Sequence, residues 1–147
     1  MGQNFRESVI FLSKWNLRKA INAYKVWFSF KVSKLAGRPI HWGMPITVAI
    51  EPTTACNLRC PECPSGLRAF TRPTGNLKLE QFKAYLDPLK NHLSNLIFYF
   101  QGEPFINPDL LAMVRHAHHL NIYTSSSTNA HFLDEDTCEK IVHSGLD

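Results

Sequence analysis

Residues 44–147 alternate three times between a short β-rich segment and a segment with helical periodicity. Strands that alternate with helices in this way form a parallel sheet with right-handed crossover connections. The sequence therefore predicts an α/β fold built from three βα units. The expected strands, each with the helix that follows it, are 46–50 and 77–93, 95–100 and 108–119, and 121–127 and 134–144.

The length of these units indicates which kind of sheet they build. A closed (β/α)₈ barrel of about 250 residues uses roughly 31 residues per unit, and residues 44–147 hold three units of this size. We therefore expect the first three βα units of a partial (β/α) barrel. A three-stranded parallel sheet keeps an open edge, which predicts that the chain is the N-terminal part of a longer protein.

Single residues set the expected limits of these elements. The strand at 95–100 is almost entirely apolar, as in a strand that is buried on both faces. Pro88 predicts a kink or break in the first helix. Asp134 is the expected N-cap of the last helix, and Gly145 is its stop signal.

Residues 1–43 are expected to form a separate arm, with a helix over 5–36 and a linker. Gly37, followed by Arg38 and Pro39, is the signal that ends this helix. Its apolar side chains recur at helical spacing and form one stripe. The stripe consists of Leu17, Ile21, Tyr24, Phe28, Val32 and Leu35.

The arm also carries the positive charge of the protein. Residues 1–38 hold eight Lys or Arg and a single acid, Glu7, which gives +7, whereas residues 39–147 hold eight basic and eleven acidic residues. Two arrangements are open for this basic amphipathic helix. It lies on an anionic membrane surface as a peripheral contact, or it packs its stripe against the following domain. The second is favoured because apolar stripes are more often part of a core.

The uneven charge also bears on partners and location. A basic surface confined to one arm does not indicate nucleic-acid binding by residues 44–147, so no nucleic-acid partner is expected. No apolar run approaches the ~20 residues of a membrane-spanning helix, and no small-residue cleavage site follows the first apolar residues. We expect a cytoplasmic protein.

Three of the four cysteines, Cys56, Cys60 and Cys63, lie in one short segment directly after the first expected strand. This spacing is that of a metal site in a reducing compartment. A structural zinc site wants four ligands, and His41 or Cys138 would have to complete it. An electron-transfer cluster wants four cysteines. Three cysteines instead suggest an iron–sulfur cluster with one iron open to another ligand.

The spacing Cys-x₃-Cys-x₂-Cys after a first strand resembles the signature of the radical S-adenosylmethionine (radical SAM) superfamily, over residues 44–147. The resemblance implies that Cys56, Cys60 and Cys63 hold three irons of a [4Fe–4S] cluster, and that SAM chelates the fourth. It further implies an enzyme that cleaves SAM reductively to a 5′-deoxyadenosyl radical for hydrogen abstraction. An external electron donor of the flavodoxin or ferredoxin type would supply the electron.

The same resemblance implies where SAM lies. Gly102, Glu103 and Pro104 match the family's Gly-Gly-Glu-like motif after the second strand, with Gln101 in place of the first glycine. Glycine lets the backbone approach a ligand closely, so Gly102 is expected nearest to SAM. The end of the third strand is expected to face the cofactor through Ser125, Ser127 and Asn129.

The segment from Ile50 to Gly66 is similar to one branch of the family in particular. This branch carries a C-terminal SPASM domain and includes peptide- and protein-modifying maturases, so the resemblance implies oxidoreductase chemistry on a peptide substrate. The alternative is a non-catalytic metal-binding domain, with zinc or an electron-transfer cluster. Specificity in such folds depends on grafted sites, and residues 1–147 do not define the substrate.

Overall fold

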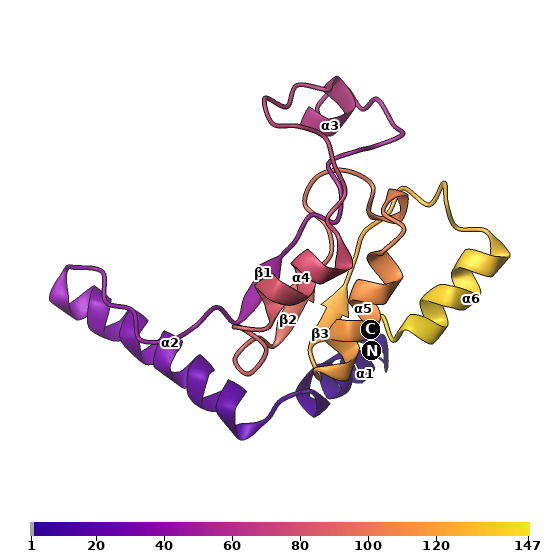
Figure 1. The fold of residues 1–147 in the computed structure, drawn as a ribbon. Coiled ribbons are helices and arrows are strands. Elements are labelled where there is room, and N and C mark those ends of the chain that lie inside the picture. Colours follow the sequence, from indigo (N-terminus) through magenta and orange to yellow (C-terminus); the bar gives the residue numbers. More distant parts are fainter. Residues whose placement is uncertain (1) are drawn as a thin grey trace.

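The centre of the fold is one parallel sheet of three short strands (Figure 1). The computed structural model describes the fold of residues 2–147 and the side chains of residues 6–147. The strands β1 (Thr47–Ala49), β2 (Asn95–Ile97) and β3 (Tyr123–Ser125) lie in the order β1-β2-β3. Val48, Leu96 and Thr124 lie level with one another in the register. The α/β fold with a parallel sheet is confirmed.

A helix follows each strand, as expected: α4 (Leu79–Leu86), α5 (Leu110–His119) and α6 (Glu135–Ser144). The central helix α5 contacts α4, β3 and α6, so the apolar core forms between the sheet and this helical layer. The fully buried core side chains are Phe82, Leu86, Leu93, Leu96, Phe98, Leu110, Met113, Val114, Ala117 and Ile122.

Some boundaries differ from the expected ones. Of the helix expected over 77–93, only Leu79–Leu86 is helical, as α4. The helix ends before Pro88, and the chain continues through turns. The second strand is shorter than expected, and the prediction that it is buried on both faces is wrong. Within β2, Leu96 is buried, whereas Asn95 and Ile97, whose side chains point to the other face, are only half-buried. One face of the sheet is therefore covered by helices, and the other is partly open.

Helix α6 has the predicted ends. The side chain of Asp134 accepts a hydrogen bond from the backbone N–H of Thr137 at 2.7 Å, and Gly145 ends the helix with φ of 79°. Two short helices were not predicted: α3 (Pro64–Leu67) and the 3₁₀ turn η1 (Pro104–Ile106). Each begins with a proline, a residue whose fixed φ suits the first turn of a helix.

The N-terminal arm is two helices, α1 (Gly2–Ser13) and α2 (Leu17–Ala36), so the prediction of one continuous helix is wrong. The break falls at Asn16, whose side chain accepts a hydrogen bond from the backbone N–H of Lys19 at 3.0 Å. Asparagine at such a position satisfies a free N–H of the following turn and so starts a new helix. Gly37 ends α2 in the left-handed conformation, as expected.

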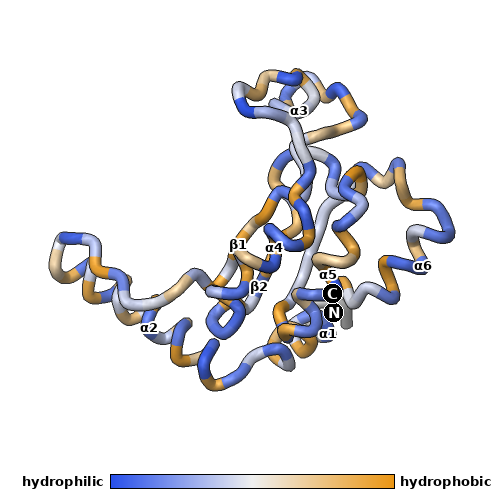
Figure 2. Tube along the Cα trace, viewed as in Figure 1, coloured by the Kyte–Doolittle hydropathy of each residue, from blue (hydrophilic) through white to orange (hydrophobic). Residues whose placement is uncertain are grey.

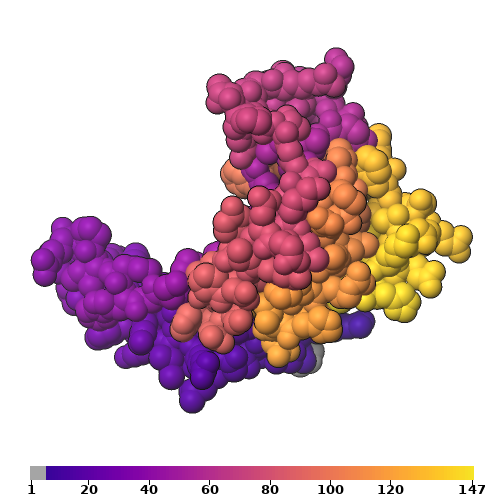
Figure 3. Space-filling view, in the orientation of Figure 1, coloured from indigo at the N-terminus to yellow at the C-terminus, as the bar shows by residue number. Residues whose placement is uncertain are grey.

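The prediction that α2 packs its apolar stripe against the domain is also wrong. The buried side chains of α2 are polar: Lys19, Asn22 and Ser29. Asn22 Nδ2 donates to the carbonyls of Met44, at 2.9 Å, and His92, at 3.4 Å, which precede β1 and β2. The helix therefore lies across the amino-terminal ends of the strands and continues past the sheet (Figures 1 and 3).

Lys19 makes a similar hydrogen bond to the segment that precedes β3. Its Nζ donates to the carbonyl of Asn121 at 2.6 Å and to that of Lys14 at 3.0 Å, and the side chain is 1% exposed. Burial, followed by the charge of Lys14, lowers the pKa of Lys19 below its usual value. The polar side of α2 is thus occupied by specific contacts with the domain. Within the part of the chain that the structure describes, no helix has the length and apolar character that crossing a membrane requires.

Candidate cofactor site

The loops that follow the three strands meet at the carboxyl end of the sheet, opposite to α2 (Figure 1). The loop after β1 is the longest, and it projects from the domain with α3 at its tip. Its base is closed where Thr53 pairs with Asn76 in an antiparallel bridge and the N–H of Leu77 donates to the carbonyl of Pro52 at 2.8 Å. The cysteine segment is therefore part of a closed excursion between β1 and α4.

The three cysteines share this loop as free thiols, with Cys56 and Cys63 half-buried and Cys60 exposed. Backbone N–H groups of Gly66 and Ser65 lower the pKa of Cys63 and so favour its thiolate, the form that binds metal. Soft thiolates fit iron–sulfur chemistry. Among the described residues, however, no three His, Cys, Asp or Glu side chains are arranged to hold a metal ion.

The cysteine loop is fastened to the loop after β2 through Ser65. Its hydroxyl donates to Gln101 Oε1 at 3.0 Å and accepts from the backbone N–H of Gly102 at 2.9 Å. The thiol of Cys63 also reaches Gln101 Oε1, at 3.5 Å. Gln101, which departs from the family's glycine, thus has a structural role here, because its amide joins the helix that follows the cysteines to the second strand loop.

Gly102 lies where a side chain could not be accommodated. A Cβ atom there would lie 2.3 Å from the carbonyl oxygen of Thr53 and 2.8 Å from that of Ala55, and φ is +79°. Glu103 follows with its N–H bonded to the carbonyl of Ala55 at 2.8 Å. A glycine at this position therefore lets the loops after β1 and β2 contact each other. This packing requirement is separate from the role near SAM that the sequence predicts for Gly102.

The carboxylate of Glu103 is buried, with 2% of the residue exposed. It accepts from the hydroxyl of Thr128 at 2.7 Å and from the backbone N–H of Asn129 at 2.8 Å, and also from the N–H of Phe105 at 3.2 Å. Pro104 is buried at the start of η1. These contacts make Glu103 the link between the second and third strand loops.

Asn129 completes the connection back to the cysteine loop. Its Nδ2 donates to Asn57 Oδ1 at 2.8 Å, and Asn57 Nδ2 lies 3.0 Å from His131 Nδ1. Asn57 directly follows the first cysteine, so the thiol segment is held on this side as well. Asn57 and Ser65 were not predicted as site residues, although Asn57 lies inside the cysteine motif.

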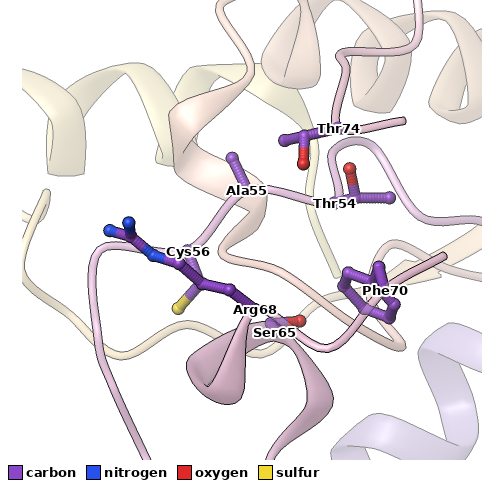
Figure 4. A pocket seen from close by; sticks show the side chains of 7 residues that line it. All are labelled: Thr54, Ala55, Cys56, Ser65, Arg68, Phe70 and Thr74. Atoms are coloured by element: carbon purple, nitrogen blue, oxygen red, sulfur yellow. The ribbon is translucent and has the colours of Figure 1, made fainter. Parts of the chain in front are cut away.

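Two cavities border the cysteine loop, and Cys56 lines both. The first, of about 320 Å³, also contains Arg68 and Phe70, with Phe70 and the side chains of Thr54 and Thr74 on one side and Cys56 and Arg68 on the other (Figure 4). The second, of about 270 Å³, lies over the strand ends and is lined by Cys56, Leu58, Tyr99, Gly102, Glu103, Ser127, Thr128 and Asn129.

The second cavity brings together most of the residues expected around SAM. Gly102, Glu103, Ser127 and Asn129 line it together with one of the cysteines. Ser125 does not line either cavity; it is half-buried at the end of β3, where its carbonyl accepts from the N–H of Phe98 at 2.7 Å. Cys138 is exposed on α6 and His41 is exposed beside α2, so neither is gathered with the cysteine loop.

A parallel sheet with a three-cysteine loop fastened to its neighbouring strand ends defines an α/β protein with a cofactor site at the carboxyl end of the sheet. Residues 50–147 match the family model of the radical SAM superfamily, and the chain belongs to this superfamily. Members of the family bind a [4Fe–4S] cluster and SAM.

Curated relatives agree with this assignment. The chain is 30% identical over 105 residues to a PqqA peptide cyclase of Rhodopseudomonas palustris, which covers 71% of this chain and 28% of the relative. It is 31% identical over 103 residues to the PqqA peptide cyclase of Gluconobacter oxydans, covering 70% and 28%. The chain thus spans less than a third of the length of these relatives.

Solved structures show the same fold. BtrN in complex with AdoMet and 2-DOIA superposes with a TM-score of 0.61 at 21% identity, over 70% of this chain and 43% of BtrN. SuiB of Streptococcus suis, bound to S-adenosylmethionine, gives a TM-score of 0.56 at 26% identity, over 74% of this chain and 25% of SuiB.

Proposed function

We propose that this chain carries the cluster- and SAM-binding part of a radical SAM enzyme, in which Cys56, Cys60 and Cys63 hold a [4Fe–4S] cluster. The observation that carries the proposal is the contact of the cysteine loop with both neighbouring strand loops, through Ser65 and Gly102 on one side and Asn57 and Asn129 on the other. When bound, such a cluster supplies the electron that cleaves SAM into methionine and a 5′-deoxyadenosyl radical.

The residues of this chain have separate tasks in that site. The cavity lined by Gly102, Ser127 and Asn129 binds SAM beside Cys56. Glu103 acts through its neighbours, because its buried carboxylate holds the backbone of Asn129 in place. The guanidinium of Arg68 in the adjoining cavity offers a positive charge to a carboxylate of SAM or of the substrate.

The peptide cyclases among the relatives support a peptide or protein as the substrate, and an oxidoreductase or maturase as the class of enzyme. We also propose, from the resemblance of the cysteine motif to the radical SAM signature, that the whole protein takes its electron from a flavodoxin- or ferredoxin-type donor and works in the cytoplasm. Residues 50–66 resemble the SPASM-containing branch, and this resemblance favours a whole protein with a C-terminal SPASM domain that holds auxiliary clusters.

Anaerobic reconstitution with iron and sulfide tests the cluster. We expect about four irons for each chain, with an EPR signal on reduction that SAM perturbs. Replacing Cys56, Cys60 or Cys63 singly by serine should abolish this signal, whereas Cys138→Ser, at an exposed position on α6, should retain it. Stoichiometric zinc without iron would identify the alternative, a non-catalytic metal-binding domain, and would contradict the proposal.

A further inference from the structure

The outward side of α2 is an exposed apolar surface. Leu17, Ile21, Tyr24, Phe28 and Leu35 recur every three, four or seven residues and therefore share one face of the helix. Their exposed fractions are 75%, 47%, 60%, 42% and 89%, respectively. Hydrophobic and hydrophilic residues alternate along α2, as expected for an amphipathic helix (Figure 2). We refer to these five residues as the outer face of α2.

Aromatic rings extend the outer face beyond the helix. Tyr24 stacks on Phe28 with ring centroids 5.8 Å apart, and Phe28 lies 5.8 Å from the ring of Trp42 in the linker. Trp27 lies 5.9 Å from Tyr24. Both tryptophans are about half exposed. The surface thus presents large amphipathic rings to the surroundings, the residue types that collect at membrane–water interfaces.

Cations border the outer face on both sides. At 100° per residue, Arg18 and Lys25 follow one edge of the face, and Lys31 and Lys34 follow the other. Lys31 lies over the ring of Trp27 and Lys34 over the ring of Phe30, at 5.7 and 5.8 Å. Among the described residues, none of these four cations forms a salt bridge with a carboxylate, so their charges are available to an anionic partner.

The domain itself cannot cover the outer face by a rotation of α2. The opposite side of the helix is fixed by Lys19, Asn22 and Ser33, which bond to the carbonyls of Asn121, Met44 and Ile40. Turning the helix would bury the outer face only by leaving these polar groups unsatisfied, and an unsatisfied buried group is costly. The outer face is therefore directed away from the sheet as a consequence of these contacts.

We propose that the outer face of α2 lies on an anionic membrane surface, with its rings at the headgroup level and its cations on the lipid phosphates. An apolar face with a basic border, on a helix that lies in the interface plane, matches this mode of binding. The four cations that border this face, Arg18, Lys25, Lys31 and Lys34, complement an anionic surface. A second copy of this chain would instead bring two such basic borders together, which costs free energy.

This arrangement has a consequence for the cofactor site. Helix α2 crosses the amino-terminal ends of the strands, and the cysteine loop projects from their carboxyl ends (Figures 1 and 3). A chain bound through the outer face of α2 would therefore present its cofactor site away from the lipid, to the aqueous side.

Co-sedimentation of the whole chain with phosphatidylcholine vesicles, with and without phosphatidylglycerol, tests the proposal and does not need the cluster. We expect binding to the anionic vesicles, weaker binding at high salt, and a blue shift of the tryptophan emission from Trp27 and Trp42. Failure of this test would leave the proposed enzymatic function untouched, and failure of reconstitution would leave this proposal untouched.

Two sets of variants separate the apolar from the charged contribution. Leu17→Gln with Leu35→Gln should reduce vesicle binding about tenfold or more for each side chain. The matched control is Tyr85→Gln with Val142→Gln, which are similarly exposed on α4 and α6 and should bind as the unaltered chain does. Lys25→Gln, Lys31→Gln and Lys34→Gln should each weaken binding to anionic vesicles about fivefold.

The outcomes are distinct. No binding of the unaltered chain to anionic vesicles at low salt, or equal binding by the Leu17/Leu35 variant, would overturn the proposal. Light scattering that shows a dimer, lost in the Leu17/Leu35 variant without any vesicle binding, would assign the outer face to a second copy instead. Circular dichroism of each variant shows whether it folds. If the Leu17/Leu35 variant does not fold, the lysine variants still test the proposal, because they change only exposed charges.

Discussion

The carboxylate of Glu103 accepts a hydrogen bond from the backbone N–H of Asn129 across 2.8 Å, and thereby joins the loop after β2 to the loop after β3. The same carboxylate accepts from the hydroxyl of Thr128. A charged acceptor strengthens both bonds, and the residue is almost completely buried. The second and third strand loops therefore form one unit, and the orientation of Asn129 depends on a residue from the neighbouring loop.

Replacing Glu103 by glutamine should destabilise the chain even without cofactors. The amide nitrogen would face a donor, either the N–H of Asn129 or the groups that bond the other oxygen, so at least one buried donor loses its acceptor. We expect a loss of about 2 kcal/mol in the free energy of unfolding, measured by urea denaturation. An unchanged midpoint would contradict the role of Glu103 in joining the two strand loops.

Gly102→Ala should be among the most harmful single substitutions in the site. The new methyl group would meet the carbonyl oxygens of Thr53 and Ala55, and the left-handed backbone adds its own cost. We expect about 3 kcal/mol of destabilisation. Gly75→Ala is the matched control, since a Cβ there has nothing within 4 Å. Equal unfolding midpoints for the two variants would contradict the close approach of the loops.

Ser65→Ala should loosen the cysteine loop without disturbing the core. The change removes the bonds to Gln101 and to the N–H of Gly102 and should cost about 1 kcal/mol for each. Hydrogen exchange of Gly102 should accelerate, because its N–H loses its acceptor. Ser127→Ala, at an exposed position of the same site, should leave this exchange rate unchanged.

His116→Leu should reduce the loss of stability on acidification. His116 packs edge-on against Phe82, and its Nε2 is buried without a hydrogen-bond partner among the described residues. Burial, followed by the charge of Lys83, lowers the pKa of His116 below 6.5 in the folded chain. The unfolded chain therefore takes up this proton first, so stability falls as the pH drops from 6.5 towards the lowered pKa.

Urea midpoints of the unaltered chain and of His116→Leu, compared between neutral and mildly acidic pH, measure this contribution. The difference between the two proteins should grow in favour of the variant as the pH falls. His143→Leu is the control, because it removes a histidine from an exposed position on α6. A constant difference across the range would show that burial of His116 does not oppose its protonation.

Local signals predicted much of the sheet domain. The βα alternation, the cap at Asp134 and the stop at Gly145 depend on neighbouring residues only, and the structure confirms them. The orientation of α2 could not be predicted in this way. Periodicity shows that a helix has two faces, but Asn22 and Lys19 bury the polar face by bonding to carbonyls distant in the sequence.

The candidate site shows the same limit. The cysteine spacing and the strand-end glycine were visible as motifs, and the structure brings Gly102 and Asn129 to one cavity with Cys56. The contacts that hold these residues were not visible, because Ser65 and Gln101 are 36 residues apart and Asn57 and Asn129 are 72 apart. The sequence around a polar side chain does not indicate which distant residue it will bond to in the fold.

The buried apolar core consists of residues from Phe82 to Ile122, and the whole excursion between Pro52 and Asn76 adds nothing to it. The side chains that retain this excursion do so through hydrogen bonds, which can open locally while the core stays intact. For the cluster proposed above, this separation means that the core can fold before iron is delivered, because none of its side chains comes from the segment that carries the cysteines.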